Sequence, residues 1–152
     1  MSAKSTGMIK TNYNYVLSIN TTPRSETATM APVAEGFDNI AESLSEVLYQ
    51  SSFLGDGGWG RSEVTGGQLI LTLSGVRVVG DAAQDYIFGD AVYFGFGENR
   101  KTDAQLTCPD GSTITCGVTL AKIARTGGAA NNATAVSVEL HFNGKPVVTT
   151  AG

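Results

Sequence analysis

The stretch Ala135–Phe142, with the sequence AVSVELHF, alternates apolar and polar residues more regularly than any other part of the chain. Its apolar residues occupy the even positions from 136 to 142, and its polar residues occupy the odd positions between them. Because successive side chains of a strand point to opposite faces, this period of two predicts a strand with one dry and one wet face. Half-buried strands of this kind are typical of antiparallel sheets.

The same period of two recurs on both sides of this strand. It predicts strands over residues 13–20, 69–78 and 113–124, and shorter strands over 27–34, 92–96 and 104–108. Turns rich in glycine, proline and asparagine separate these segments. The pattern predicts a mostly β fold, an antiparallel β-sandwich or barrel with one flanking α-helix.

That helix is expected to begin after Gly80. Asp81 is a good N-cap residue, and Gln84 stands three positions later, where its side chain can reach back to the amide of the cap. The helix would end near Phe88-Gly89. Asp81 and Gln84 are therefore predicted to be its structural cap.

A second segment has helical spacing. Apolar residues recur at positions 37, 40, 41, 44, 47 and 48, with acidic and serine residues between them. This spacing places the apolar residues on one side of a helix and predicts an amphipathic helix over 37–48. The following stretch, Gly55–Gly60, is predicted to be a loop or the end of a hairpin.

The composition limits the function. The chain has 152 residues, which predicts a single domain over 1–152 with a flexible N-terminal arm, 1–10, and a flexible C-terminal tail, 146–152. A formal net charge of −4 argues against a protein that binds nucleic acid through a basic surface. Neither a secretory signal nor an apolar run long enough to span a membrane is present in the sequence, so we expect no membrane association.

The residue patterns of common active sites are missing from the sequence. The single histidine, His141, lies on the polar face of a predicted strand, and no nucleophile elbow accompanies it. Asp81 and Asp85 are one helical turn apart but have no histidine or cysteine beside them, and no phosphate-binding loop is found. We therefore expect a protein that is not an enzyme and that has no catalytic, cofactor or metal site.

Several stretches, in this order along the chain, carry a resemblance to a known family. They are Ala31–Ile40, Phe53–Gly58, Val64–Gly66, Ser74–Phe88, Pro109–Ser112 and Val138–Pro146. The most specific are GDAAQDYI at 80–87 and FNGKP at 142–146. In these stretches the sequence resembles the major tail tube proteins of long-tailed bacteriophages, especially the branch from phages of Gram-positive hosts.

The resemblance implies a structural virion protein. In this family six copies join edge to edge into a ring, and rings stack into the hollow tube through which DNA leaves the capsid without specific binding. The implied partners are further copies, a tape-measure protein, a tail terminator and a distal tail protein. The implied location is the phage tail, assembled in the host bacterial cytoplasm. The resemblance matches the one regular helix to Asp81–Phe88 and favours a loop or strand over 37–48, against the helical spacing.

Candidate functional residues follow from this resemblance. Glu139 and His141, on the polar face of the best strand, are the first candidates to face the interior of the tube, the lumen; an ordinary solvated face is the alternative. A negative subunit suits a conduit for DNA because carboxylates in the lumen would repel phosphate. The candidate inter-subunit loop consists of Gly55, Asp56, Gly57, Gly58 and Trp59.

Two other functions stay open at this stage. The chain could form the inner tube of a contractile tail or of a related injection machine, which has the same architecture inside a sheath. It could instead be a β-sandwich that binds carbohydrate or another ligand through Trp59, Tyr93 and Phe94.

Overall fold

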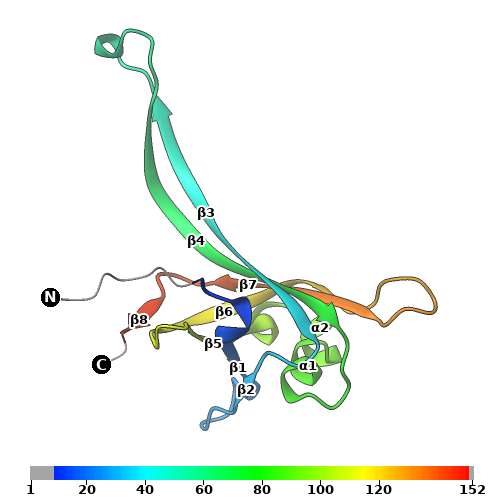
Figure 1. Cartoon of the computed structure of the whole chain (residues 1–152). Helices are drawn as coiled ribbons and strands as arrows, with labels where there is room; N and C mark the ends of the chain where they lie inside the picture. Colours follow the sequence, from blue (N-terminus) through cyan, green and yellow to red (C-terminus); the bar gives the residue numbers. More distant parts are fainter. Residues whose placement is uncertain (1–8, 151–152) are drawn as a thin grey trace, which may run out of the picture.

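The computed structural model describes residues 9–150, so the predicted flexible arm 1–10 lies largely outside the described residues. Figure 1 shows a small β-sheet body from which one long hairpin projects. The strands are β1 (Val16–Asn20), β2 (Met30–Pro32), β3 (Phe37–Ser51), β4 (Arg61–Val76), β5 (Lys101–Thr107), β6 (Thr113–Ala124), β7 (Ala135–Phe142) and β8 (Val147–Thr149). Two short α-helices, α1 (Ala82–Ile87) and α2 (Asp90–Tyr93), and three 3-10 turns, η1 (Asn12–Asn14), η2 (Leu54–Asp56) and η3 (Gly97–Arg100), complete the described part.

All strands belong to one antiparallel sheet in the order β2-β1-β5-β6-β7-β4-β3, and β8 pairs with the start of β6. The sheet curls, so that β1 and the residues just after β2 face the start of β3 and Leu73 of β4 across a groove of about 310 Å³. Its two edge strands are β2 and β3. The prediction of a mostly β, antiparallel fold is confirmed.

The core lies on the concave face of the curled sheet. β7 alternates as expected, because its even-numbered residues are buried and its odd-numbered residues, from Ser137 to His141, are only partly buried. Side chains from β1, β4, β5 and β6 pack against it, and α1 covers the open side with Ala83, Ile87 and Phe88. Burial of this shared apolar face is the main force that holds the sheet curled.

The helix predicted over 37–48 is wrong. These residues form most of β3, which pairs with β4 from Phe37↔Gly75 to Ser51↔Arg61. The partner strand begins at Arg61, directly after the predicted loop Gly55–Gly60, and so includes residues 61–67. A helix here would need an apolar surface of its own chain to cover its stripe, whereas Leu44 and Leu48 stay exposed. The alternative of a strand, which the resemblance favoured, is confirmed.

The strand predicted over 92–96 is also wrong, because α2 occupies its first half and adds a second short helix to the expected one. Phe94 ends this helix, and its amide donates a hydrogen bond to the Asp90 carbonyl. The guanidinium of Arg125 stacks on the rings of Tyr93 and Phe94. Aromatic residues that suit a strand are thus held in a helical turn by a long-range contact. The predicted strand 27–34 shrinks to β2, and the predicted flexible tail contains β8.

Candidate functional site

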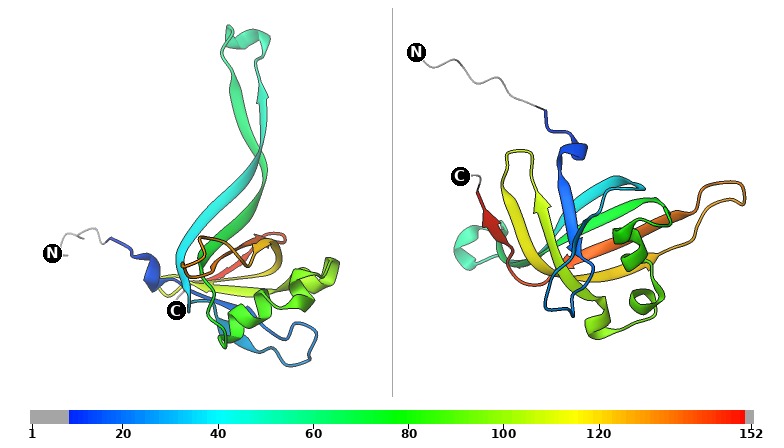
Figure 2. Two further views of the ribbon diagram at one scale, coloured as in Figure 1. Left: turned by 90° about the vertical axis from the view of Figure 1, so that its right-hand side faces the viewer. Right: turned by 90° about the horizontal axis from the view of Figure 1, so that it is seen from below.

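The candidate functional site is the hairpin of β3 and β4, residues 37–76. β7 pairs with β4 only from Ile70 to Val76. Beyond Leu44↔Leu69 the hairpin has no further strand beside it among the described residues. We call residues 44–69 the distal arm. At roughly 3.3 Å per residue, its paired part is about 25 Å long. Figure 1 and the left view of Figure 2 show that the arm projects from the body.

The distal arm exposes an unusual amount of apolar surface. Within the described residues, its large apolar side chains with high exposure are Leu44, Val47, Leu48, Tyr49, Phe53, Leu54, Trp59 and Val64. Single exposed apolar residues are common on monomers, but this many on one short hairpin indicate an interaction surface. Among residues 9–150, no other element of the chain packs on the arm and buries this surface.

The end of the arm is an ordered turn. The Asp56 carboxylate accepts hydrogen bonds from the Phe53 amide and from Arg61 Nε, each at 2.9 Å, and the Arg61 guanidinium lies 5.5 Å from the centre of the Phe53 ring. Gly57 has a left-handed backbone (φ 61°), which glycine adopts without strain. The turn presents Leu54, which is fully exposed, and Trp59, which is 81% exposed.

This turn should open in acid. The Phe53 amide and the Arg61 guanidinium lower the pKa of Asp56 below its ordinary value. A carboxylate with a lowered folded-state pKa stabilises the turn above its ordinary pKa, and this stabilisation is lost as the pH falls through the lowered value. We therefore expect the amide resonance of Phe53 in an NMR titration to move below about pH 4. Asp56→Asn should abolish this step, and a midpoint at or above the ordinary carboxyl pKa would contradict the assignment.

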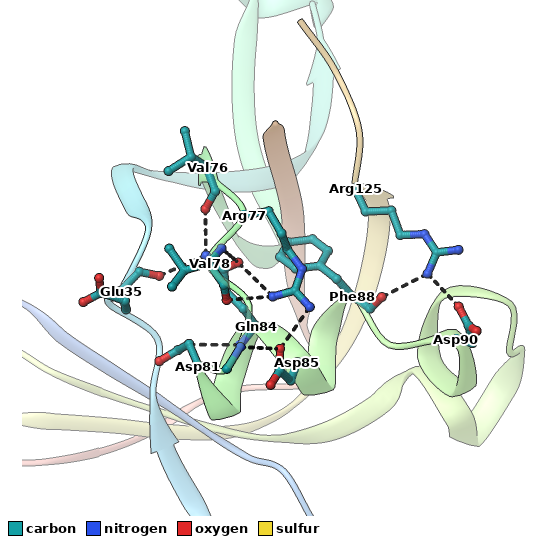
Figure 3. Close-up of polar contacts among 11 residues, drawn as sticks. Glu35, Val76, Arg77, Val78, Asp81, Gln84, Asp85, Phe88, Asp90 and Arg125 are labelled. Carbon is teal, nitrogen blue, oxygen red and sulfur yellow. Dashed lines mark hydrogen bonds and ion pairs between the residues drawn. The ribbon is translucent and has the colours of Figure 1, made fainter. Parts of the chain in front are cut away.

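The base of the hairpin is fixed by Gln84, which is fully buried on α1 (Figure 3). Its Oε1 accepts a hydrogen bond from the Val78 amide at 2.8 Å, and its Nε2 donates to the carbonyls of Glu35 and Val76 at 2.9 Å each. Glu35 precedes β3 and Val76 ends β4. One side chain therefore joins the entry and the exit of the hairpin.

The sequence predicted a different use of this residue. The Asp81 carboxylate does accept a hydrogen bond from the Gln84 amide, at 3.1 Å. The Gln84 side chain, however, points to the hairpin base and not back to the amide of Asp81. Arg77 supports the same region, since its guanidinium lies 3.0 Å from the Asp85 carboxylate (Figure 3).

Two glycines bring the hairpin strands together beside Gln84. A Cβ atom on Gly75 would lie 2.0 Å from the Gly36 carbonyl oxygen, so no larger residue fits there without moving the backbone. Gly36 itself has a positive φ of 84°. The base of the hairpin is thus a close backbone contact, and it sets the direction in which the arm leaves the body.

Glu139 and His141 lie on the outer face of the sheet, away from the core. His141 Nε2 is 2.9 Å from Glu139 Oε1, and Lys122 Nζ lies 3.8 Å from the same carboxylate. Lys122 has a left-handed backbone (φ 49°), where the pairing of β6 with β7 shifts between Ala121 and Ala124. The three side chains form a partly neutralised cluster on an otherwise hydroxyl-rich face.

The three aromatic residues of the ligand-binding alternative are not brought together. Trp59 is at the end of the distal arm, next to η2, whereas Tyr93 and Phe94 belong to α2 and its cap on the body (Figure 1). Tyr93 and Phe94 contact each other and Arg125 instead. These three residues therefore form no shared aromatic platform for a sugar.

None of the helices in residues 9–150 has the length and apolar character needed to cross a membrane.

Comparison with known proteins relates the fold to phage-like tails. No protein-family model and no curated protein matches the sequence. Among solved structures, a chain from the tail of an empty gene transfer agent (GTA) particle, refined with C6 symmetry, has a TM-score of 0.70 and 16% identity over 93% of this chain and 100% of that one. A chain of the native gene transfer agent virion has a TM-score of 0.66, with the same identity and coverage.

A third similar structure comes from a contractile machine. A chain in the extended sheath–tube complex of an extracellular contractile injection system (PVC) has a TM-score of 0.52 and 12% identity, over 93% of this chain and 91% of that one. The chain therefore has the fold of proteins in phage-like tail assemblies. At these identities the similarity concerns the fold.

Proposed function

We propose that the chain is a structural, non-enzymatic subunit that assembles with copies of itself into stacked rings, forming the tube of a phage-like tail. The observation that carries this proposal is the distal arm, an ordered hairpin with exposed apolar side chains and no partner within the described part of its own chain. The similar folds in a C6-symmetric tail and in an injection system support it. The assignment to phages of Gram-positive hosts rests on the sequence stretches alone.

The outer edge of β3 is a second reason for assembly, because no strand pairs with it among residues 9–150. This edge is fifteen residues long, and a free edge of this length pairs readily with another strand.

In this proposal the outer face of β4, β7 and β6 lines the lumen, with Glu139 and His141 on it. The pairing of Glu139 with Lys122 and His141 leaves that face close to neutral. DNA would pass over it without specific binding. The tape-measure protein, the tail terminator and the distal tail protein are further partners by resemblance, and the place of action is the virion.

The inner tube of a contractile tail or injection machine is the second candidate. The similarity to a chain of the sheath–tube complex favours it, and its architecture is the same apart from the surrounding sheath. Co-sedimentation of assembled tubes with the product of a neighbouring sheath gene would distinguish this candidate from a tube without a sheath.

Electron microscopy of the purified protein tests the proposal. Negative staining of a concentrated sample is expected to show rings or hollow tubes of constant diameter, and light scattering should rise above a threshold concentration. A protein that stays monomeric in analytical ultracentrifugation at millimolar concentration, with no rings on the grid, would contradict the proposed function.

A further inference from the structure

The formal net negative charge of the chain comes from the hairpin. Residues 37–76 contain five carboxylates and a single cation, Arg61. The rest of the chain contains nine acidic and nine basic residues, which cancel, so the hairpin carries the whole formal net charge of −4. The five carboxylates belong to Asp38, Glu42, Glu46, Asp56 and Glu63.

Two of these carboxylates share a face with apolar residues. Alternation along β3 places Glu42, Leu44, Glu46 and Leu48 on the same side, and Val64 pairs with Leu48 from the other strand. The three apolar side chains are all more than half exposed. We call these five residues the leucine–glutamate face.

The body has a surface of complementary character at α2 and η3. Phe94 is 65% exposed and Phe96 is 87% exposed. Arg24 donates a hydrogen bond to the Asn99 side chain at 2.8 Å, and the Arg125 guanidinium lies 4.9 Å from the centre of the Phe94 ring. We call this surface the aromatic corner and assign to it the residues Arg24, Asp90, Phe94, Phe96, Glu98, Arg100, Lys101 and Arg125.

The aromatic corner is net positive, with four cations against two carboxylates. Two of these cations are held by the body: Arg125 pairs with Asp90 at 2.8 Å, and Arg100 donates to the carbonyls of Gly95, Tyr93 and Leu120. Arg24 and Lys101 remain exposed at the rim. They are the groups that an acidic partner would meet.

The leucine–glutamate face and the aromatic corner of the same chain do not contact each other. Figure 1 and the left view of Figure 2 show the distal arm extending away from the body, whereas α1 and α2 lie beside the body end of the hairpin. The part of the leucine–glutamate face on the distal arm (Leu44, Glu46, Leu48 and Val64) therefore has no partner among residues 9–150 of its own chain, and Glu42 lies at the foot of this face. Apolar residues that alternate with carboxylates fit a surface of exposed rings with cations at its rim.

We propose that the leucine–glutamate face of one copy docks on the aromatic corner of another copy. This inference rests on the proposed function and adds the acceptor surface to it. The contact joins two different patches, so it is heterologous and repeats from copy to copy. Glu42 and Glu46 meet Arg24 and Lys101, while Leu44, Leu48 and Val64 cover Phe94 and Phe96. Assembly should then weaken with salt, since charges at the rim are screened within about 8 Å at physiological ionic strength.

Charge reversal tests the contact. The arm variant is Glu42→Lys/Glu46→Lys, and the corner variant is Arg24→Glu/Lys101→Glu. Matched controls change the charge equally elsewhere: Glu26→Lys/Glu35→Lys for the arm and Lys10→Glu/Lys145→Glu for the corner. All of these residues are exposed, and Arg24 makes one surface hydrogen bond, to Asn99. Circular dichroism checks that each variant folds.

The decisive measurement is the threshold concentration for tube formation, followed by light scattering and microscopy. Each charge-reversed variant alone should raise it at least about tenfold, since two opposed like-charge pairs cost a few kcal/mol. An equimolar mixture of the two variants should return to within about twofold of wild type, because copies that alternate along the contact restore opposite charges. The matched controls should assemble like wild type.

The outcomes separate this inference from the proposed function. If wild-type protein never assembles, the proposed function fails and this inference fails with it. If wild type assembles and the arm variant assembles equally well, the docking contact is wrong while the tube function stands. If the arm variant fails and the mixture does not recover, the arm contacts another surface and the aromatic corner is not its acceptor.

Discussion

Replacing Gln84 by methionine is expected to lower the free energy of unfolding by about 3–5 kcal/mol. Methionine has nearly the same shape but cannot form the three side-chain hydrogen bonds that join α1 to the hairpin. The Glu35 and Val76 carbonyls and the Val78 amide would lose these partners, and a buried unpaired polar group costs about 1–3 kcal/mol. Urea unfolding followed by circular dichroism measures the change.

A matched variant separates this effect from the loss of an ordinary glutamine. Gln50→Met removes a glutamine from the exposed part of β3, where its amide makes one long hydrogen bond of 3.4 Å to Ser62. It should change the free energy of unfolding by less than about 0.5 kcal/mol. If Gln84→Met cost as little as Gln50→Met, Gln84 would not be what fixes the base of the hairpin.

Gln84 also shows why local rules predicted the helix and missed the role of its side chain. The capping pattern depends on residues three positions apart, and Asp81 does accept from the Gln84 amide. The Gln84 side chain bonds to Glu35, 49 positions earlier in the sequence. A pattern over a short stretch of sequence cannot include two residues that are so far apart. The sequence offered one signal, which is that Gln84 lies on the same side of the helix as the apolar residues Ile87 and Phe88.

The strand β7 was predictable because its own chain buries one of its faces. Each even-numbered residue has to be apolar to fill the core, so the alternation is strict. The segment 37–48 lacked this constraint. Its apolar residues satisfy a period of 3.6 and also fit a strand, because only Phe37 and Ile40 pack against the core while Leu44, Val47 and Leu48 are exposed. Pairing with β4 decides between helix and strand, and the residues of β4 lie outside the segment 37–48.

The polar cluster at Glu139 could be predicted only in part from the sequence. Alternation placed Glu139 and His141 on the wet face of β7, and the structure adds Lys122, which a β-bulge brings close to Glu139. The orientation of this face in an assembly, toward the lumen or away from it, depends on how the copies are arranged. No contact within one chain encodes that orientation, so the lumen-facing role of both residues stays a prediction.

Placing aspartates at the end of the arm, in Leu54→Asp/Trp59→Asp, should prevent tube formation without destabilising the monomer. Both side chains are exposed, so the free energy of unfolding should change by less than about 0.5 kcal/mol. In an assembly each buried apolar side chain contributes about 1.5–3 kcal/mol, so losing two at every contact should raise the threshold concentration at least a hundredfold. Light scattering measures that threshold, and electron micrographs show whether tubes are present.

The control for this variant is Val79→Asp, which adds a carboxylate at an equally exposed apolar position on the body, just before α1. If the ordered turn at Asp56 exists to present Leu54 and Trp59 to another copy, this control should assemble near the wild-type threshold. Equal losses in both variants would mean that added negative charge alone blocks assembly. Normal tubes from the double variant would show that the end of the arm is not an inter-subunit contact, and the apolar surface that matters would then lie lower on the hairpin, at Leu44, Leu48 and Val64.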